Sequence, residues 1–441
     1  MEFLKLKAMA EKLGINEVEA YSVKNNGMDV SFFDGDIIGN TTKMTNVMCI
    51  RGVYNNHIAT VYTERLDEEG ISLALNTIKQ NATLITKEDP YIMYEGSKEY
   101  PTIAERDVDF DKASAQDKIN LCKRLDTLLK SKSELVYKTE ISYAESESTK
   151  EIKNSNGLSC IKDSRSAYIV AEVICLKDGD MKVAYDYVFI NKMADLDLDK
   201  FADKLIDDAV SQFGADSIPS GSYDVVLDRD ALRGLMGAYS SAFCADSVLK
   251  NMSFLKDKLE TKVFGDNVTL IDDPLNAMSV DQDTFDDEGV ATKTKTVVEG
   301  GVLKTYLHNL ATAKMMNTEA TGNGFKPSIA SPVGVSPENL YLKPGNKSLD
   351  ELFEAVGNGV YINSLDGLHA GVNTISGDFS LKASGYNIEG GKKTSPVTLI
   401  IITSSFQEIL NKISYIGNDL EFRGGFGAPS IALKGIAISG K

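Results

Sequence analysis

The sequence is poor in the residues from which metal sites are built. Its 441 residues include only three histidines, His57, His308 and His369, which are far apart in the chain. A metallohydrolase needs two or three imidazoles or carboxylates that converge on one ion, and zinc helices commonly carry an H-E-x-x-H pair. No such pair is present. This absence argues against a metal centre built from a local motif, although distant residues could still converge in space.

Cysteines are few and are not arranged in pairs. The chain has five of them and no C-x-x-C motif: Cys49, Cys122, Cys160, Cys175 and Cys244. An odd number of widely spaced cysteines indicates reduced thiols that are buried as small hydrophobic side chains. A disulfide framework and a zinc ribbon are both disfavoured.

Long apolar runs and an excess of basic residues are also missing. The longest apolar candidate, 397–402, has the length of a strand, whereas a membrane span needs about 18 apolar residues. The first seven residues mix charges among apolar positions, unlike the core of a signal peptide. The net charge is −17, which opposes binding to nucleic acid phosphates. We therefore expect a cytoplasmic protein with no membrane span and no direct nucleic-acid partner.

The first half of the chain shows one order of elements twice. The pattern predicts a helix, several short strands and a second helix, with the sequence Asn-Asn-Gly at 25–27 as a turn between two strands. In the first set the helices are 2–13 and 66–81, and the strands lie near 18–24, 28–34, 45–53 and 56–63. In the second set the helices are 115–132 and 198–213, and the strands are 134–148, 157–162 and 166–189. The connections between strands are too short for crossovers, so an antiparallel sheet is expected.

Domain limits follow from the linkers. The chain is too long for one ordinary core, and the segment 214–222 has the glycine, serine and proline content of a linker. We predict an N-terminal α+β domain at 1–213, which could divide again near 85–112, and a β-rich C-terminal domain at 223–441. Within the latter, a strand at 223–227 precedes a helix from 228 to about 244, and short helices are expected near 305–316 and 348–355. The fold class is mixed α+β.

Short polar and glycine-rich motifs are concentrated between residues 285 and 389. They are F-D-D-E-G at 285–289, G-V-L at 301–303, T-G-N at 321–323, G-V-N at 371–373, G-D-F-S at 377–380 and G-Y-N-I-E at 385–389. A packed core requires apolar periodicity, whereas glycine and carboxylate at turns indicate a close approach of backbone to another group. This stretch is the best candidate for a functional site.

The acidic residues at 281–288 superficially resemble a calcium-binding loop. An EF-hand needs oxygen ligands at alternate positions and glycine at the sixth, but Phe285 takes the fifth position here and Asp286 the sixth. Two interpretations remain. The carboxylates could cap backbone amides ahead of Gly289, or they could line a cleft that binds a cation or the basic groups of a peptide.

Other local motifs for catalysis are absent or incomplete. The sequence G-G-K-K-T at 390–394 lacks the glycine spacing of a phosphate-binding loop, and no G-x-S-x-G motif occurs. The glycine-rich segment 424–429 is more typical of a chain reversal than of a nucleotide site. These absences argue against a serine hydrolase but do not exclude one, because its catalytic residues could come from distant segments.

Taken in order, the motifs at 285–389 resemble those of the TldD/PmbA family, known as modulators of DNA gyrase and as peptidases of the U62 type. The resemblance covers the second half of the chain and includes Y-L at 306–307 and T-A at 312–313. It implies an N-terminal α+β region, a β-rich C-terminal domain, and a dimer with a cleft that admits unfolded peptide. It also implies two kinds of chain. One binds zinc through an H-E-x-x-x-H helix and a late cysteine, and the other, the PmbA/TldE type, lacks these ligands and pairs with the first.

This sequence resembles the second kind. The zinc helix would fall after Asp228, where residues 232–244 contain neither histidine nor glutamate, and the last cysteine of the chain is Cys244. The resemblance therefore implies a chain without a cofactor, with zinc in a TldD-type partner. Two alternatives stay open: a hydrolase with an unrecognised site, and a stand-alone peptide-binding or chaperone-like homodimer. The candidates for residues that line or support a peptide cleft are Asp286, Asp287, Glu288, Asn323, Asn373 and Asp378; no catalytic residue and no metal ligand is expected.

Overall fold

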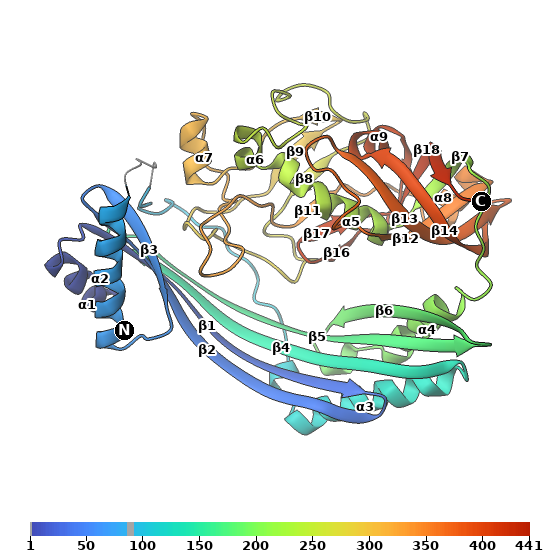
Figure 1. The fold of residues 1–441 in the computed structure, drawn as a ribbon, viewed down its shortest axis with the longest axis horizontal. Coiled ribbons are helices and arrows are strands. Elements are labelled where there is room, and N and C mark those ends of the chain that lie inside the picture. The colour runs from blue at the N-terminus through green and yellow to red at the C-terminus, as the bar shows by residue number, and fades with distance from the viewer. Residues whose placement is uncertain (1, 86–91) are drawn as a thin grey trace. The chain divides into compact units, whose positions relative to one another are not determined.

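A computed structural model describes residues 2–85 and 92–441. They form two compact units (Figure 1). The first consists mainly of 2–85, 92–96 and 104–213, and it also includes Ser328–Ser331. The second consists of Ser97–Ile103, Gly214–Pro327 and Pro332–Lys441. Both units combine helices with sheets, which confirms the α+β fold class.

The first unit is built on one antiparallel sheet of six long strands. Its order is β3-β2-β1-β4-β5-β6. The strands are β1 (Glu17–Phe33), β2 (Asp36–Tyr54), β3 (His57–Thr63), β4 (Val136–Asn154), β5 (Ser159–Lys177) and β6 (Asp180–Phe189), and the helices are α1 (Phe3–Lys12), α2 (Glu68–Leu84), α3 (Ala115–Lys132) and α4 (Leu198–Val210). The predicted repetition is confirmed as two sets of helix, three strands and helix, and the sets join where β1 pairs with β4.

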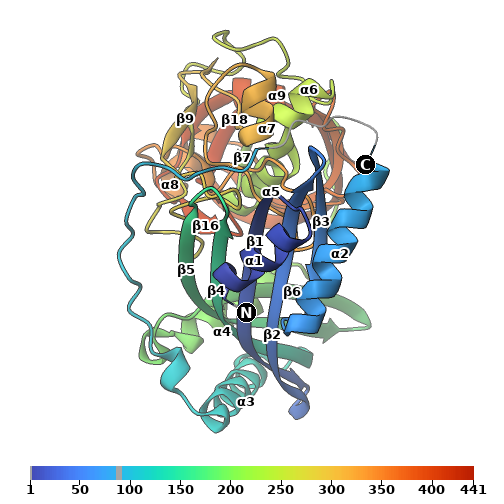
Figure 2. The same ribbon diagram turned by 90° about the vertical axis from the view of Figure 1, so that its left-hand side faces the viewer.

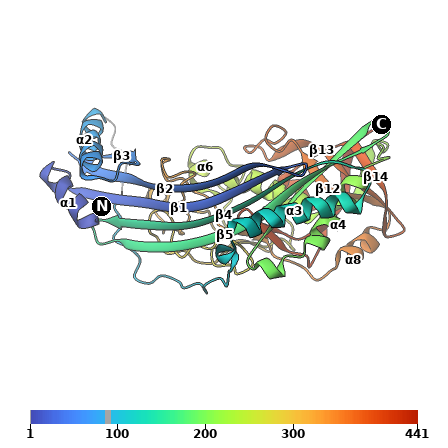
Figure 3. The ribbon, with the colours of Figure 1, turned by 90° about the horizontal axis from the view of Figure 1, so that it is seen from below.

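The helices pack on one face of this sheet, at its two ends. Val18 and Ala20 of β1 belong to the core formed with α1 and α2, whereas Val30 and Phe32 belong to the core formed with α3 and α4. All four are even-numbered positions of one strand, so they project from the same face. Figure 3 shows the two pairs of helices at opposite ends of the strands, and Figure 2 shows α2 running alongside β3.

The prediction of a turn at 25–27 is wrong. Strand β1 runs through this point, and Asn26 faces Met44 on one side and Glu147 on the other. Because this stretch pairs with neighbouring strands on both sides, the sheet overrides the local turn propensity. The further division predicted near 85–112 lies partly outside the described residues.

The second unit contains two mixed sheets, a large apolar core and a smaller apolar cluster that includes Leu352 and Phe353 of α8 (Leu349–Val356). One sheet has the order β10-β9-β8-β11-β17-β16, and the other has the order β14-β13-β12-β7-β18-β15. Strand β14 also pairs with β18, so that the second sheet closes into a small barrel. The strands are β7 (Gly221–Leu227), β8 (Leu270–Asp272), β9 (Lys295–Glu299), β10 (Val302–Leu303), β11 (Leu340–Leu342), β12 (Gly359–Asp366), β13 (Asp378–Glu389), β14 (Lys392–Ser405), β15 (Ile413–Ile416), β16 (Glu421–Arg423), β17 (Phe426–Ala428) and β18 (Ile431–Ser439).

The helices of the second unit are short. They are α5 (Arg229–Tyr239), α6 (Ala245–Leu249), α7 (Leu310–Met315), α8 (Leu349–Val356) and α9 (Phe406–Asn411). The helix expected at 228–244 is interrupted, because α5 ends at Tyr239 and a 3-10 turn leads into α6. The Tyr239 ring stacks on Phe406 with centroids 5.0 Å apart, which anchors the end of α5 in the core. Among the described helices, none is both long and apolar enough to cross a bilayer.

Candidate functional site

The F-D-D-E-G motif forms a buried turn whose first carboxylate binds backbone amides. Asp286 is completely buried. Its Oδ1 accepts hydrogen bonds from the amides of Glu288 (3.0 Å) and Val290 (2.9 Å), and its Oδ2 accepts one from the amide of Gly324 (2.8 Å). The side chain therefore closes its own turn and ties it to the T-G-N motif.

Burial changes the acidity of this group. The pKa of Asp286 is raised to about 8. Removal of the carboxyl group from water is the larger cause, and repulsion by the nearby Glu288 carboxylate is the second. The three amide donors act in the opposite direction, because they stabilise the ionised form.

The next two carboxylates bind two other segments. Asp287 accepts a hydrogen bond from the amide of Lys326 at 2.8 Å. Glu288 accepts one at 2.7 Å from the amide of Leu310, the first residue of α7. Both acidic residues are about 6% exposed. The motif thus joins three stretches of chain that are separate in sequence.

Asn323 lies at the centre of an adjoining buried network. Its amide nitrogen donates to Asp272 Oδ2 (2.8 Å) and to the carbonyl oxygen of Ser336 (2.9 Å). Its amide oxygen accepts from Lys295 Nζ (3.0 Å) and from the Thr321 hydroxyl (2.7 Å). All four hydrogen-bonding positions of the Asn323 side chain are therefore satisfied.

The network includes an ion pair that the sequence analysis missed. Lys295 Nζ lies 2.8 Å from Asp272 Oδ2, and the two side chains are 7% and 0% exposed. The sequence carried one signal for it. Lys295 occupies the same face of β9 as the buried Val297, so strand alternation alone places this lysine toward the interior.

Glycines allow the two networks to approach each other. Gly322 has a φ of +71°, and a Cβ atom there would lie 2.8 Å from the carbonyl oxygen of Ala291. At Gly324 a Cβ atom would lie 2.7 Å from Glu288 Oε2. A side chain at either position would force these segments apart.

A segment from the first half of the chain covers the acidic turn. Ser97–Ile103 belongs to the second unit. The Tyr100 hydroxyl donates to the carbonyl oxygen of Gly289 at 2.8 Å, and the amide of Ala291 donates to the Ser97 hydroxyl at 2.9 Å. The Tyr100 ring also packs edge-on against Phe285, with centroids 6.2 Å apart. No pattern in the residue order predicts that this connecting stretch contacts the motif.

The last two candidate residues lie in a different place. Asn373 and Asp378 occupy an exposed turn that leads into β13. Asn373 Oδ1 accepts from the amides of Ile375 (3.0 Å) and Ser376 (3.2 Å), and the Asp378 carbonyl oxygen accepts from the Tyr239 hydroxyl at 2.8 Å. The structure therefore brings four of the six candidates together and leaves these two in a local turn.

Helix α5, where the zinc ligands were sought, does not fit a zinc ion. It presents no histidine, cysteine or glutamate, and the Asp230 carboxylate is bonded to Arg233 at 2.6 Å. Burial raises the pKa of the nearby Cys244 thiol, which favours the neutral form over the thiolate that binds metals. Within residues 2–85 and 92–441, no group of three or more His, Cys, Asp or Glu side chains is placed to hold a metal ion.

His308 is the one histidine within this region. It is 4% exposed, and its Nδ1 has no hydrogen-bond partner among the described atoms. Burial lowers the pKa of the imidazole, so the ring is neutral at pH 7. Its backbone amide is bonded to the Thr321 hydroxyl at 2.7 Å, which places it next to the T-G-N motif.

Proteins of known structure share the whole fold. A protein from Thermotoga maritima, described as a modulator of a DNA gyrase, is 31% identical with a TM-score of 0.89, and the match covers 99% of this chain and 100% of that one. TldE from Thermococcus kodakarensis has a TM-score of 0.90 over 99% of this chain and 100% of that one. Its identity is 19%, so this likeness concerns the fold.

Curated relatives match over shorter stretches. A metalloprotease of Methanocaldococcus jannaschii is 36% identical over 47% of this chain and 46% of that protein. A metalloprotease PmbA homologue of Buchnera aphidicola is 26% identical over 61% of this chain and 58% of that protein. The matched stretch thus spans about half the length of these relatives.

Models of the family's domains match most of the chain. The PmbA/TldA metallopeptidase C-terminal domain matches residues 220–440, and the PmbA/TldA metallopeptidase central domain matches residues 108–213. The first match alone spans half of the sequence and contains all the motifs between 285 and 389. The chain belongs to the PmbA/TldD metallopeptidase family.

Proposed function

We propose that this chain is the zinc-free, PmbA/TldE-type subunit of a cytoplasmic metallopeptidase complex that processes unfolded peptides or small proteins. The observation that carries the proposal is the composition of α5. This helix occupies the place expected for the zinc ligands, but it buries Leu232, Leu235 and Tyr239 and offers no imidazole, thiolate or glutamate. In this proposal the hydrolytic chemistry belongs to a TldD-type partner chain that carries H-E-x-x-x-H.

In the same proposal the acidic turn supports the peptide cleft and does not contact substrate. Asp286, Asp287 and Glu288 are buried, and each accepts at least one backbone amide from another segment. Carboxylates engaged in this way hold loops in place and are not free to bind a basic peptide group. Asn323 would have a similar role through its four bonds, and Asn373 and Asp378 would shape the turn before β13.

Co-expression with a chain that carries H-E-x-x-x-H tests the proposal. We expect a stable complex that contains zinc and cleaves unfolded peptides in a chelator-sensitive manner, whereas this chain alone should bind no stoichiometric zinc and cleave nothing. Metal analysis and a peptide-cleavage assay on both preparations measure the outcome. Zinc and cleavage in this chain alone would favour a hydrolase with an unrecognised site. Failure to form a complex would favour the stand-alone peptide-binding homodimer.

A further inference from the structure

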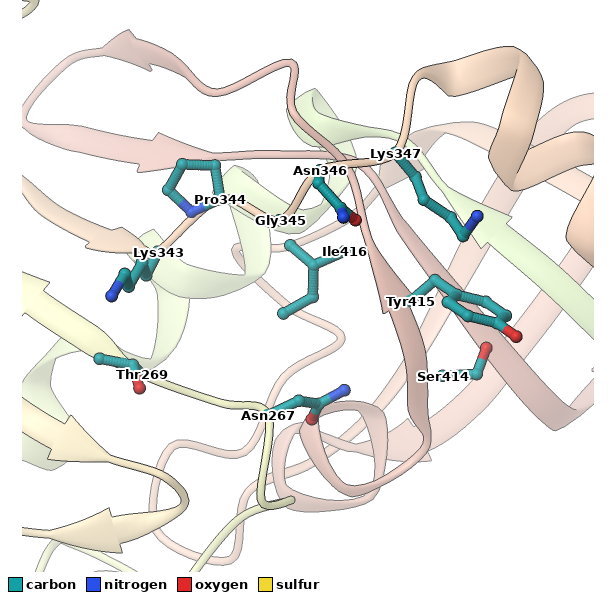
Figure 4. Close-up of a pocket in the computed structure, with 10 residues that line it drawn as sticks. All are labelled: Asn267, Thr269, Lys343, Pro344, Gly345, Asn346, Lys347, Ser414, Tyr415 and Ile416. Carbon is teal, nitrogen blue, oxygen red and sulfur yellow. The ribbon is translucent and has the colours of Figure 1, made fainter.

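A pocket of about 310 Å³ lies within the second unit, away from the acidic turn. Its walls are the loop 343–347 between β11 and α8, strand β15, and the segment just before β8. Figure 4 shows Lys343 and Lys347 on opposite sides of this pocket, with Ile416 between them. Thr269 lies near Lys343, while Ser414 and Tyr415 lie near Lys347 (Figure 4).

Backbone hydrogen bonds hold the walls in position. The amide of Lys343 donates to the Thr269 carbonyl oxygen at 2.9 Å, and the amide of Gly345 donates to the Gly417 carbonyl oxygen at 2.8 Å. The loop approaches β15 so closely that a Cβ atom on Gly345 would lie 2.2 Å from the Ile416 carbonyl oxygen. A ligand would thus meet a preformed site and would not need to order these loops on binding.

The pocket has a surplus of hydrogen-bond donors. No aspartate or glutamate lines it, although the chain as a whole carries a charge of −17. Some other lysines of the unit pair with a carboxylate, as Lys304 does with Glu260 at 2.5 Å. Over the described ranges, neither Lys343 nor Lys347 has a carboxylate within 4.0 Å, and the Lys347 ammonium instead lies 5.1 Å from the centroid of the Tyr415 ring.

Two further groups add to this surplus. The Asn346 side-chain amide and the Tyr415 hydroxyl make no hydrogen bond to any described residue. Together with the two ammonium groups, they give the pocket four side chains that can donate to an acceptor. Lys343, Asn346 and Tyr415 are exposed and Lys347 is half-buried, so water reaches these donors in the free chain, and a ligand with several acceptor oxygens is the partner that would use them together.

We propose that this pocket binds a small phosphorylated molecule. A phosphate monoester carries a charge of about −1.5 to −2 at pH 7 and three strong acceptor oxygens, which match two ammonium groups and the neighbouring donors. Lysine binds phosphate as a point charge, and two lysines line this pocket. The volume is at the lower end for ligand sites, so the ligand is a small metabolite.

Calorimetric titration of the full chain tests the proposal, with pyrophosphate and inorganic phosphate as probes at constant ionic strength. We expect saturable binding at one site, stronger for pyrophosphate. The variant Lys343→Gln/Lys347→Gln should weaken it by about 100-fold, which is about ten-fold for each charged hydrogen bond removed. The matched control is Lys392→Gln/Lys434→Gln, which removes the same charge from exposed lysines outside the pocket and should leave affinity unchanged.

Circular dichroism verifies that both variants remain folded, which is expected because no ion pair is broken. The proposal is overturned if the probes give no more heat than chloride, or if the pocket variant binds as tightly as the unmodified chain. A titration in which succinate binds and the phosphates do not would instead make the site one for carboxylates. If both variants lose affinity equally, the binding depends on the overall charge of the chain and not on this pocket, and the assignment is also overturned.

Discussion

Two turns of the second unit show how similar sequence signals can have different structural roles. The segment 285–289 with its neighbour 321–323, and the turn at 371–378, both combine glycine with aspartate or asparagine. Asp286 and Asn323 are fully buried, whereas Asn373 and Asp378 are exposed. The side chains of Asp286 and Asn323 hold distant segments together, whereas the side chain of Asn373 shapes its own turn.

The difference can be counted in hydrogen bonds. Asn323 is bonded to four groups from as many residues, among them the buried pair Asp272 and Lys295. Asn373 accepts two amides that lie within three residues of it. Loss of a bond in the buried network leaves a polar group without water, but loss of a bond in the exposed turn leaves a group that water can reach.

The largest effect is expected when the buried ion pair is broken. Lys295→Met should lower the free energy of unfolding by about 3–5 kcal/mol, because it leaves the Asp272 carboxylate buried and uncompensated. Lys382→Met is the matched control, since Lys382 pairs with Asp366 at 3.2 Å with both side chains 54% exposed. That variant should cost about 0–1 kcal/mol. Urea unfolding of the three proteins measures both values.

A double variant sharpens this comparison. Asp272→Asn/Lys295→Met removes both charges and should be more stable than Lys295→Met alone, because no buried charge remains unpaired. If Lys295→Met and Lys382→Met cost the same, the contrast between the buried network and the exposed surface does not hold.

The pH dependence of stability tests the buried turn from another side. The pKa of Asp286 is raised in the folded state, to about 8 from its usual 3.8, so the folded chain holds a proton that the unfolded chain releases. The stability from this group is therefore present below about pH 4 and is lost as pH rises toward 8. Relative to Asp286→Asn, the unmodified chain should lose about 1.4 kcal/mol per pH unit between pH 5 and 8.

Denaturant unfolding of both proteins at several pH values measures this difference. Parallel stability curves would mean that Asp286 is ionised in the folded state and that its three amide donors outweigh burial.

The smallest effect is expected in the exposed turn. Asn373→Ala removes an acceptor for two local amides and should cost about 1 kcal/mol, as for other capping side chains. Asn323→Ala should cost about 3 kcal/mol or more, because it leaves buried partners unsatisfied. Thermal unfolding of the two alanine variants side by side gives the ratio. Equal losses would remove the distinction between the two turns.

Much of the fold was predictable because it depends on local pattern. Alternation along strands and helical spacing predicted the twofold order of elements in the first half, and the structure confirms it. The error at Asn26 has a physical cause, since a turn signal cannot reveal that both neighbouring strands continue past it. The covering of Phe285 by Tyr100 was invisible for a similar reason, because the contact joins residues 185 positions apart.

The sequence by itself determined the α+β class, the family motifs and the absence of histidine and glutamate from the helix after Asp228, because these depend on residue identity and short-range periodicity. Only the tertiary structure decided which polar residues act together. Burial set Asp286 and Asn323 apart from Asn373 and Asp378, and it brought Lys295 to Asp272. The tertiary structure also placed Lys343 and Lys347 around one pocket whose lining includes no carboxylate. The contribution of a charge or an amide to stability depends on its surroundings in space, which residue order does not specify.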